Sequence, residues 1–504
     1  MSNGVFLSLN VMNFFGLIIM LGCCSWWVSV ESTASEQAPE SAVSSKDSVS
    51  HKTEENNSSS NKLTFKEVLA ASYNLTYLKS AQYDVQGGYE SLSTAKRDWL
   101  PTVNIQSSYA ADFNHQRTNQ SYQNGSTPPG SVTENVHTHK ANNALSLNQN
   151  LFAGGKTTAG IRAQKYGVEK SRAAYSKQEC SFLAAVIKAY SDLVLKKLIY
   201  GVRIANLKVL QEQVAVARSS NELGANTISD VAQTEAKLAK VKAAISLARA
   251  EVEGARANFE RLTGLTGDLP LEHPPLPDNL PQTKEEAIQW ALENNPDLKA
   301  AEAESKQYQE FVKQVRSDLL PSIDVGTSVA KNVYSSWGKA GFQKNETDQF
   351  EAMASLKIPL DFRGSSQASL RKQKYEAAKK RIDSINLRRK IIADIVNKWE
   401  IMVAKLKNIQ ENQEQVKAAK VAYDCMKEEF TAGMKTTLHL LSAEQEYFSA
   451  QIEWLASQQD HLQSAYELLA EIGILNAKFL DLPVESFVHE EYANVPVWGT
   501  SIKE

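Results

Sequence analysis

The chain repeats itself, and this internal repeat constrains the fold more than any other feature of the sequence. Residues 294–299 and 317–321 resemble residues 74–79 and 97–101 at an offset of 220 residues. Farther along the chain, glycines recur at an offset of 209 residues: Gly155 with Gly364, Gly224 with Gly433, and Gly264 with Gly473. The smaller second offset places a longer insertion in the first copy. It contains residues 119–130, whose Asn, Ser, Gly and Pro predict a surface loop.

Each copy predicts the same order of elements: a helix, two strands, a very long helix, a tight turn and a shorter helix. We expect the first repeat to cover residues 62–270 and the second to cover residues 283–480. A linker at residues 271–282 separates them, and residues 481–504 form a C-terminal tail. The predicted fold class is therefore mainly α with a small β part.

The longest predicted element of each repeat is a proline-free stretch, at residues 156–222 and 365–430. A helix of this length extends for ~100 Å at ~1.5 Å per residue, which no globular core requires. The helix after it, at residues 227–262, repeats every seven residues as coiled-coil seams do. One seam position holds Val231, Leu238, Ile245, Val252 and Phe259, and the other holds Thr234, Val241, Ala248, Ala255 and Leu262. The second repeat has Leu441, Phe448, Leu455, Leu462 and Leu469 in the same spacing.

The short helices of each repeat add up to the length of the long one. In the first repeat the short helices are expected at residues 64–97 and 227–262, and in the second at residues 283–316 and 436–471. We therefore expect two short helices to stack end to end beside each long helix. The result is a pair of long α-helical hairpins packed as coiled coils.

Alternation of apolar and polar residues predicts two strands in each repeat, each with one apolar and one polar face. The apolar positions include Val103, Ile105 and Tyr109 in the first strand, Leu145, Leu147 and Leu151 in the second, Ile323 and Val325 in the third, and Phe350 to Leu360 in the fourth. Four strands cannot close a barrel, and an open sheet edge is not viable in lipid. A membrane location therefore requires an oligomer. The alternative is a soluble periplasmic coiled-coil protein with a small sheet.

The N-terminus predicts export. Residues 1–30 resemble a signal peptide, although no Lys or Arg precedes the apolar core. Residues 31–61 are rich in Ser, Glu, Asn and Thr and predict a disordered linker. Cys23 follows Leu and Gly as in a lipidation site, but Met20 fits that pattern poorly.

Composition argues against nucleic-acid binding and reveals no catalytic pattern. The chain has 504 residues and a net charge of −3, with both signs interspersed. Gly154-Gly155-Lys156 lacks the spacing of a phosphate-binding loop, and His115, His137 and His139 are interpreted as surface histidines. We therefore expect neither an enzyme nor a cofactor.

Two stretches that precede the long helices resemble a known family. Residues 149–155 (Gln-Asn-Leu-Phe-Ala-Gly-Gly) and 358–364 (Ile-Pro-Leu-Asp-Phe-Arg-Gly) look like the strand-to-helix signature of the TolC-type outer-membrane efflux proteins. With the tandem repeat, the resemblance covers about residues 63 to 482.

The resemblance implies a homotrimer in the outer membrane of a Gram-negative bacterium. Its four antiparallel strands per chain contribute to a twelve-stranded β-barrel, and its helices to a twelve-helix periplasmic tunnel. Such a channel is the exit duct of a drug efflux pump or a type I protein secretion system. Its partners are a periplasmic adaptor protein and an inner-membrane pump or ABC transporter. A periplasmic adaptor, or a structural coiled-coil envelope protein without a pore, is the alternative.

The two helix-turn-helix tips are the candidate functional sites. Gly224 and Gly433 are expected to end the long helices, while Thr227 and Thr436 are placed to cap the helices that follow. These turns are explained by capping alone. The resemblance adds that they dock an adaptor and close the periplasmic entrance.

By position, the resemblance also assigns candidate residues of the entrance gate. Asp230, Phe430 and Lys435 would make polar links between the tips, with an Asp230–Lys435 ion pair among them. His439 and Ser442 stand where better-known members have two rings of aspartate, which puts strong cation block in doubt. Because an unperturbed His titrates near ~6.5, we expect His439 to make the entrance responsive to pH.

Overall fold

The structure is a computed structural model, and it describes residues 64–73, 77–119, 131–224, 227–268, 270–277, 279–338 and 341–484. The predicted signal peptide with Cys23, the linker at 31–61, residues 120–130 of the predicted loop and residues 485–504 of the tail lie outside the described residues.

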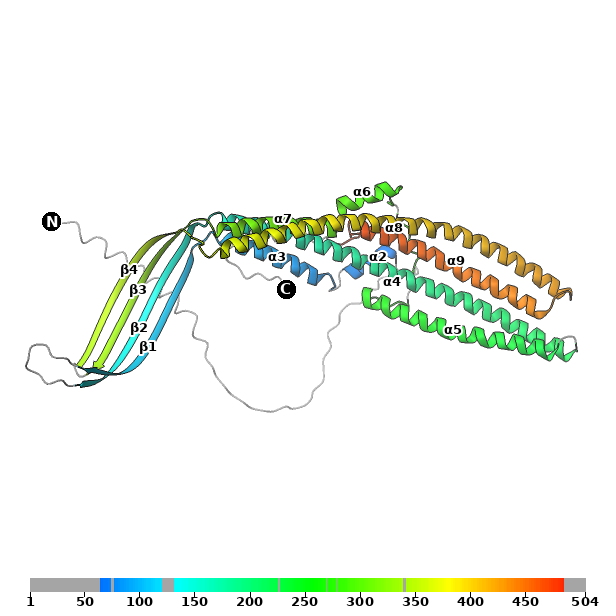
Figure 1. The fold of residues 1–504 in the computed structure, drawn as a ribbon. Coiled ribbons are helices and arrows are strands. Elements are labelled where there is room, and N and C mark those ends of the chain that lie inside the picture. Colours follow the sequence, from blue (N-terminus) through cyan, green and yellow to red (C-terminus); the bar gives the residue numbers. More distant parts are fainter. Residues whose placement is uncertain are drawn as a thin grey trace, which may run out of the picture. The chain divides into compact units, whose positions relative to one another are not determined.

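The elements follow the same order twice (Figure 1). The first repeat consists of α2 (Phe65–Tyr73), α3 (Lys79–Arg97), β1 (Thr102–Asn119), β2 (Ser131–Phe152), α4 (Lys156–Glu222) and α5 (Ile228–Thr263). The second consists of α6 (Lys284–Asn294), α7 (Pro296–Ser317), β3 (Ser322–Gly338), β4 (Gly341–Lys357), α8 (Ser365–Thr431) and α9 (Thr437–Ile472). The mainly α fold with a small antiparallel β part is confirmed.

The short helices stack along the long ones as expected. Helices α4 and α8 each have 67 residues. Helices α3 and α5 both pack against α4, α9 packs against α8, and α7 lies along both long helices (Figure 1). The sheet connects to one end of α4 and α8, and the turns into α5 and α9 form the other end. These two turns are called the tips below.

The prediction of an unbroken first helix in each repeat is wrong. Residues 64–97 form two helices, α2 and α3, and residues 283–316 form α6 and α7. In the second repeat the break falls at Asn295, whose ψ of 121° leaves the helical region. A residue before proline avoids the helical conformation for steric reasons, and Pro296 follows directly. The Asn295 side chain then caps α7 by accepting a hydrogen bond from the Leu298 N–H.

The main core forms where α2, α3, α4, α5 and α9 meet, about halfway along α4. Its largest fully buried side chains include Tyr190, Leu183 and Phe259. The Tyr190 ring contacts Phe65 edge-on at a centroid distance of 5.4 Å, and its hydroxyl donates to the Glu272 carbonyl at 2.6 Å. Each such buried side chain contributes about 1.5–3 kcal/mol by the hydrophobic effect.

One buried carboxylate joins three parts of this core. Glu179 of α4 accepts hydrogen bonds from the Tyr73 hydroxyl of α2 at 3.2 Å and from the Ala477 N–H, beyond α9, at 3.0 Å. Burial raises the pKa of Glu179, and these hydrogen bonds oppose the shift. The partners satisfy a polar group that would otherwise be costly to bury.

The sheet has the strand order β1-β2-β3-β4, all antiparallel. One row across it pairs Ile105 with Leu145, Leu145 with Val329, and Val329 with Phe350. The adjacent row holds Gln106, Ala144, Ala330 and Gln349 and points to the opposite face. The apolar face is uncovered: Ile105 is 79% exposed and Phe350 is 74% exposed. Among the described residues, β1 and β4 each pair with another strand on one side only.

Among the described residues, no helix has both the length and the apolar content needed to cross a membrane.

Candidate functional site

The first tip is closed by a complete capping box. Gly224 has a left-handed φ of 72°, which lets the chain leave α4 without steric strain. Thr227 is the N-cap of α5: its hydroxyl oxygen accepts from the Asp230 N–H, and the Asp230 carboxylate accepts from the Thr227 N–H at 3.1 Å. The same carboxylate also accepts from the Thr227 hydroxyl at 2.7 Å. Thr227 and Asp230 therefore stabilise the turn itself.

The second tip has similar backbone angles at its glycine and its N-cap threonine, but a different set of side-chain hydrogen bonds. Gly433 has a φ of 77°, and Thr436 occupies the N-cap of α9 with extended φ and ψ. The Thr436 hydroxyl makes no capping hydrogen bond. It lies 2.8 Å from Nδ1 of His439 instead. Thr436 therefore stands at the N-cap of α9 as expected, but its side chain does not make the capping hydrogen bond. In the capping box of the first tip, Asp230 at the third helical position accepts from the Thr227 N–H, whereas His439 at that position of the second tip contacts the Thr436 hydroxyl.

The predicted gate residues lie at the tips, but within the protomer they have other partners. Asp230 is used by the capping box, and Lys435 lies 4.0 Å from a Glu429 carboxylate oxygen. Ser442 donates to the Leu438 carbonyl of its own helix at 2.8 Å. An Asp230–Lys435 pair is not formed between the described residues of one chain, so a link across the tips stays a prediction.

Large apolar side chains project from both tips. Leu223 is 85% exposed, and Ile228, Met434 and Leu438 are also exposed. Exposed clusters of this kind are typical of surfaces that bind another protein. Leu223 and Met434 flank the predicted glycines, so the sequence already contained this signal.

The far end of the sheet carries an aromatic row on its apolar face. Phe113 pairs with His137, His137 with Trp337, and Trp337 with Phe342. Phe113, Trp337 and Phe342 are exposed. A girdle of aromatic residues bordering an apolar band is typical of barrel strands at a membrane–water interface.

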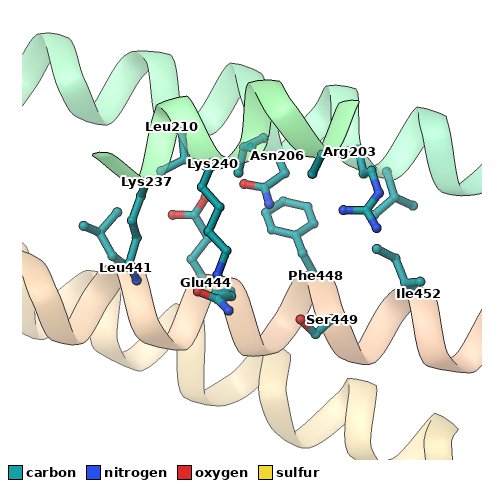
Figure 2. A pocket seen from close by; sticks show the side chains of 14 residues that line it. Arg203, Asn206, Leu210, Lys237, Lys240, Leu441, Glu444, Phe448, Ser449 and Ile452 are labelled. Carbon is teal, nitrogen blue, oxygen red and sulfur yellow. The ribbon is translucent and has the colours of Figure 1, made fainter. Parts of the chain in front are cut away.

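A pocket that sequence analysis missed lies between α4, α5 and α9 (Figure 2). Its volume is about 140 Å³, and it is lined in part by Arg203, Lys237, Lys240 and Glu444. The seven-residue repeat of α9 already indicated that Glu444 is unusual. Glu444 follows Leu441 by three residues, in the second seam position, where a coiled coil prefers an apolar residue.

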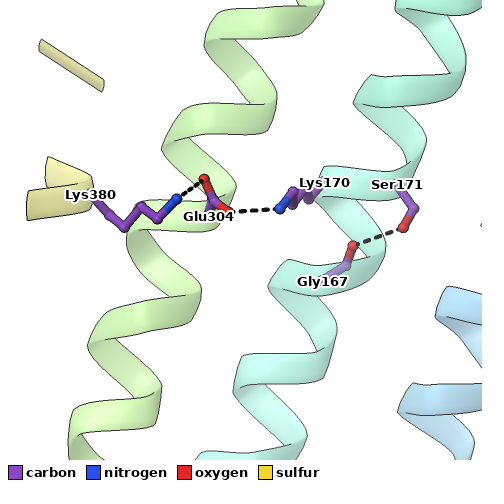
Figure 3. A network of polar contacts seen from close by, with 5 residues as sticks. All are labelled: Gly167, Lys170, Ser171, Glu304 and Lys380. Atoms are coloured by element: carbon purple, nitrogen blue, oxygen red, sulfur yellow. Dashed lines mark hydrogen bonds and ion pairs between the residues drawn. The ribbon is translucent and has the colours of Figure 1, made fainter. Parts of the chain in front are cut away.

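A second missed feature is a charge clamp across three helices (Figure 3). Glu304 of α7 binds Lys170 of α4 at 2.7 Å through one carboxylate oxygen and Lys380 of α8 at 3.1 Å through the other. Burial raises the pKa of Glu304, but the hydrogen bonds and charges of both lysines outweigh it, so the pKa is lowered overall. The clamp ties the two long helices to each other through α7.

The geometry of tips, hairpins and sheet agrees with known proteins. The family model described as outer membrane efflux protein matches residues 70–265 and 287–473. The chain is 28% identical to outer membrane efflux protein BepC of Brucella suis biovar 1 (strain 1330) over 348 residues, which are 69% of this chain and 75% of BepC. It is 25% identical to alkaline protease secretion protein AprF of Pseudomonas aeruginosa over 356 residues, 69% of this chain and 72% of AprF.

A solved structure of the outer-membrane channel OprN has the same fold. It superposes with a TM-score of 0.66 at 20% identity and covers 81% of this chain and 88% of OprN. Because the family model matches both repeats, the chain belongs to the outer membrane efflux proteins, the TolC-type family of the Gram-negative outer membrane.

Proposed function

We propose that three copies of this chain form an export channel through the outer membrane. The observation that carries the proposal is a four-stranded sheet with two free edges and an uncovered apolar face. A free edge in lipid leaves backbone N–H and C=O groups without partners, which costs several kcal/mol for each group. Closing the sheet against other copies removes both edges.

The strand order allows this closure. Since β1 and β4 run in opposite directions, β4 of one copy can pair antiparallel with β1 of the next. Three copies make a closed ring of twelve strands, an even number as in other bacterial barrels. The apolar face with Ile105 and Phe350 then points to lipid, and the polar face with Gln106 and Gln349 lines the pore.

The hairpins would continue the pore into the periplasm. Each chain contributes two long helices and two stacks of short helices, so a trimer builds a twelve-helix tunnel. At ~1.5 Å per residue, a 67-residue helix extends ~100 Å from the sheet toward the tips.

The tips would dock a periplasmic adaptor and close the entrance. Gly224, Thr227, Gly433 and Thr436 shape the two turns, and the exposed Leu223 and Met434 give an adaptor apolar side chains to bind. The gate candidates lie at this end of the helices: Asp230 in the first turn of α5, Phe430 in the last turn of α8, and Lys435 between α8 and α9. An exposed Asp230–Lys435 ion pair between chains would be worth about 0–1 kcal/mol, which suits a link that an adaptor must release.

His439 would make this entrance sensitive to pH. It is exposed and bonded to Thr436, while Ser442 one turn on carries no charge. Single-channel conductance of the native protein should change across about pH 5.5 to 8. The variant His439→Ala should have a flat profile, and identical profiles would refute the role of His439.

The cargo depends on the inner-membrane partner, a pump or an ABC transporter. BepC is named for efflux and AprF for alkaline protease secretion, so we propose a duct that serves an efflux pump or a type I secretion system. We assign the chain no enzymatic activity. A periplasmic adaptor or a pore-free envelope protein is disfavoured because neither needs an exposed apolar sheet face.

Neighbouring residues on opposite faces of β1 provide the test. Ile105→Lys places a charge on the proposed lipid face, at a cost of about 2–4 kcal/mol near the bilayer centre. Gln106→Lys places it in the proposed pore. We expect the first variant to lose the heat-modifiable oligomer in outer-membrane fractions. The second should keep the oligomer and shift its ion selectivity in planar bilayers. A native protein that is a soluble monomer, or equal tolerance of both variants, contradicts the channel.

A further inference from the structure

Glu444 occupies an unusual position on α9. It lies seven residues, about two turns, from the start of that helix, and it is only 2% exposed. Apolar side chains surround it in the seam, with Leu441 and Phe448 one turn away on either side. A carboxylate in such a place must be neutral, paired or hydrated.

Its partners among the described residues leave it only half satisfied. The Gln213 amide of α4 donates to Oε2 of Glu444 at 2.5 Å. Oε1 of Glu444 is buried and has no hydrogen-bond partner in the described part of the chain. The same holds for Oδ1 of Asn206 and Nε of Arg203, which belong to residues that line the same pocket. Several unsatisfied polar atoms around about 140 Å³ indicate a space that admits water.

The charged side chains that line the pocket around Glu444 come from α4 and α5 (Figure 2). Arg203 of α4 and Lys237 and Lys240 of α5 line the pocket, yet the described residues form no ion pair with the Glu444 carboxylate. From α8, Tyr423 lies close enough for the Glu444 charge to raise its pKa, after burial as the larger cause. Glu212 and Asp424 add negative charge around Tyr423. Burial also lowers the pKa of Lys237.

We propose that Glu444 is a proton-controlled latch that holds α9 against the α4/α5 hairpin near the tips. In its protonated form the carboxyl group is uncharged and accepts a hydrogen bond from the Gln213 amide. The seam between the helices then stays packed. In its ionised form the buried charge draws water into the pocket and loosens α5 from α9.

The linkage between protonation of Glu444 and packing of the seam determines how pH changes the stability of the packed form. Burial raises the pKa of Glu444 to about 7 in the packed seam, against the lowering effects of the Gln213 hydrogen bond and the Lys237 charge. In a loosened, hydrated seam the pKa returns toward its ordinary value of about 4.3. The packed form is therefore fully favoured below about pH 4.3, and this preference is lost as the pH rises through about 7.

Hydrogen exchange of the full-length protein tests the latch without any transport assay. Protection factors of peptides from α5 and α9 on both sides of the pocket, corrected for the intrinsic pH dependence of exchange, should fall about tenfold from about pH 5.5 to 8. A peptide from α3 serves as the internal reference. Glu444→Gln stays uncharged, so its protection should not change with pH. Glu446→Gln, an exposed position two residues on, should behave like the native protein.

A second variant keeps the test decisive if Glu444→Gln does not fold. Gln213→Met removes the hydrogen bond that lowers the pKa of Glu444, so the midpoint of the exchange transition should move to higher pH. The latch is overturned if native exchange shows no such transition, if Glu444→Gln keeps it, or if Gln213→Met leaves the midpoint unchanged. The claim that the latch regulates entry into a channel rests on the proposed function. The hydrogen-exchange experiment does not depend on that function, so the latch can be refuted while the channel stands, and the channel can be refuted while the latch stands.

Discussion

The two long helices have the same length and the same place in their repeats, but they differ in what covers them. Helix α4 buries side chains along most of its length, from Ala159 to Ala217. Helix α8 buries only Ile391, Ile395, Met402 and Ala419. The repeat offset makes the contrast direct, because Ala173 of α4 is 7% exposed while its counterpart Ile382 of α8 is 57% exposed.

The difference follows from the neighbours. Helix α4 contacts α2, α3, α5, α7 and α9, whereas α8 contacts α6, α7 and α9. Helix α8 nevertheless carries large apolar side chains, and several are exposed: Tyr375, Ile382, Ile385, Ile401, Val403, Leu406 and Val421. The long helices of the two repeats therefore differ in how much of their surface the chain itself covers. Helix α4 organises the core of one chain, and α8 presents a surface suited to other chains of the proposed trimer.

The largest expected effect is at the centre of α4. Tyr190→Ala removes a fully buried ring from the core and should cost about 3–5 kcal/mol of unfolding free energy. Urea unfolding in detergent, followed by circular dichroism, measures the loss. Tyr190→Phe removes only the hydrogen bond to Glu272 and should cost about 1 kcal/mol. Equal losses in the two variants would show that packing around the ring is not what stabilises α4.

The next prediction separates assembly from folding. Ile382→Asp on α8 should leave the helix content of the chain unchanged but shift the oligomer toward monomer in size-exclusion chromatography. Ala173→Asp, at the matching position of α4, buries an unpaired charge and should unfold the chain. If Ile382→Asp assembles normally, the exposed face of α8 is not an interface.

A smaller effect is expected where the two helices are joined. Glu304→Gln breaks the clamp to Lys170 and Lys380 and should cost about 1 kcal/mol, since the lysines are partly exposed. The lowered pKa of Glu304 means that the clamp contributes above about pH 4.3 and is lost as the pH falls through its folded pKa. Thermal unfolding at neutral pH and at about pH 3 measures this. The exposed Glu302→Gln should show no such pH-dependent difference from the native protein.

The smallest effect distinguishes the two tips at the ends of α4 and α8. Thr227→Val removes the cap of α5 and should reduce protection of its first turn by about 1 kcal/mol, seen by hydrogen exchange. Thr436→Val should matter less for α9, because that hydroxyl bonds to His439 instead of the backbone. A larger loss at Thr436 would reverse the assignment of the caps.

The sequence predicted the elements whose signals are local. The proline-free stretches, the glycines after them and the alternating strands are visible in single segments, and α4 begins and ends where it was expected. The break at Asn295 was missed although Pro296 marks it, because the end-to-end length argument favoured a continuous helix. The Glu444 pocket had one local signal, a carboxylate at a seam position, but its lining comes from three helices. The Glu304 clamp also joins three helices, and no local pattern encodes it. The capping rule alone does not predict the contact between Thr436 and His439, because a side chain three residues on competes with the backbone for the threonine hydroxyl.

The duplication also has a consequence for symmetry. A proposed trimer contains six copies of the repeat, but α4 and α8 can no longer exchange places, because one is covered by its own chain and the other is open. The ring therefore has three equivalent positions of each kind and not six of one. In the proposed trimer, a substitution in one kind of tip would act at alternate positions around the entrance.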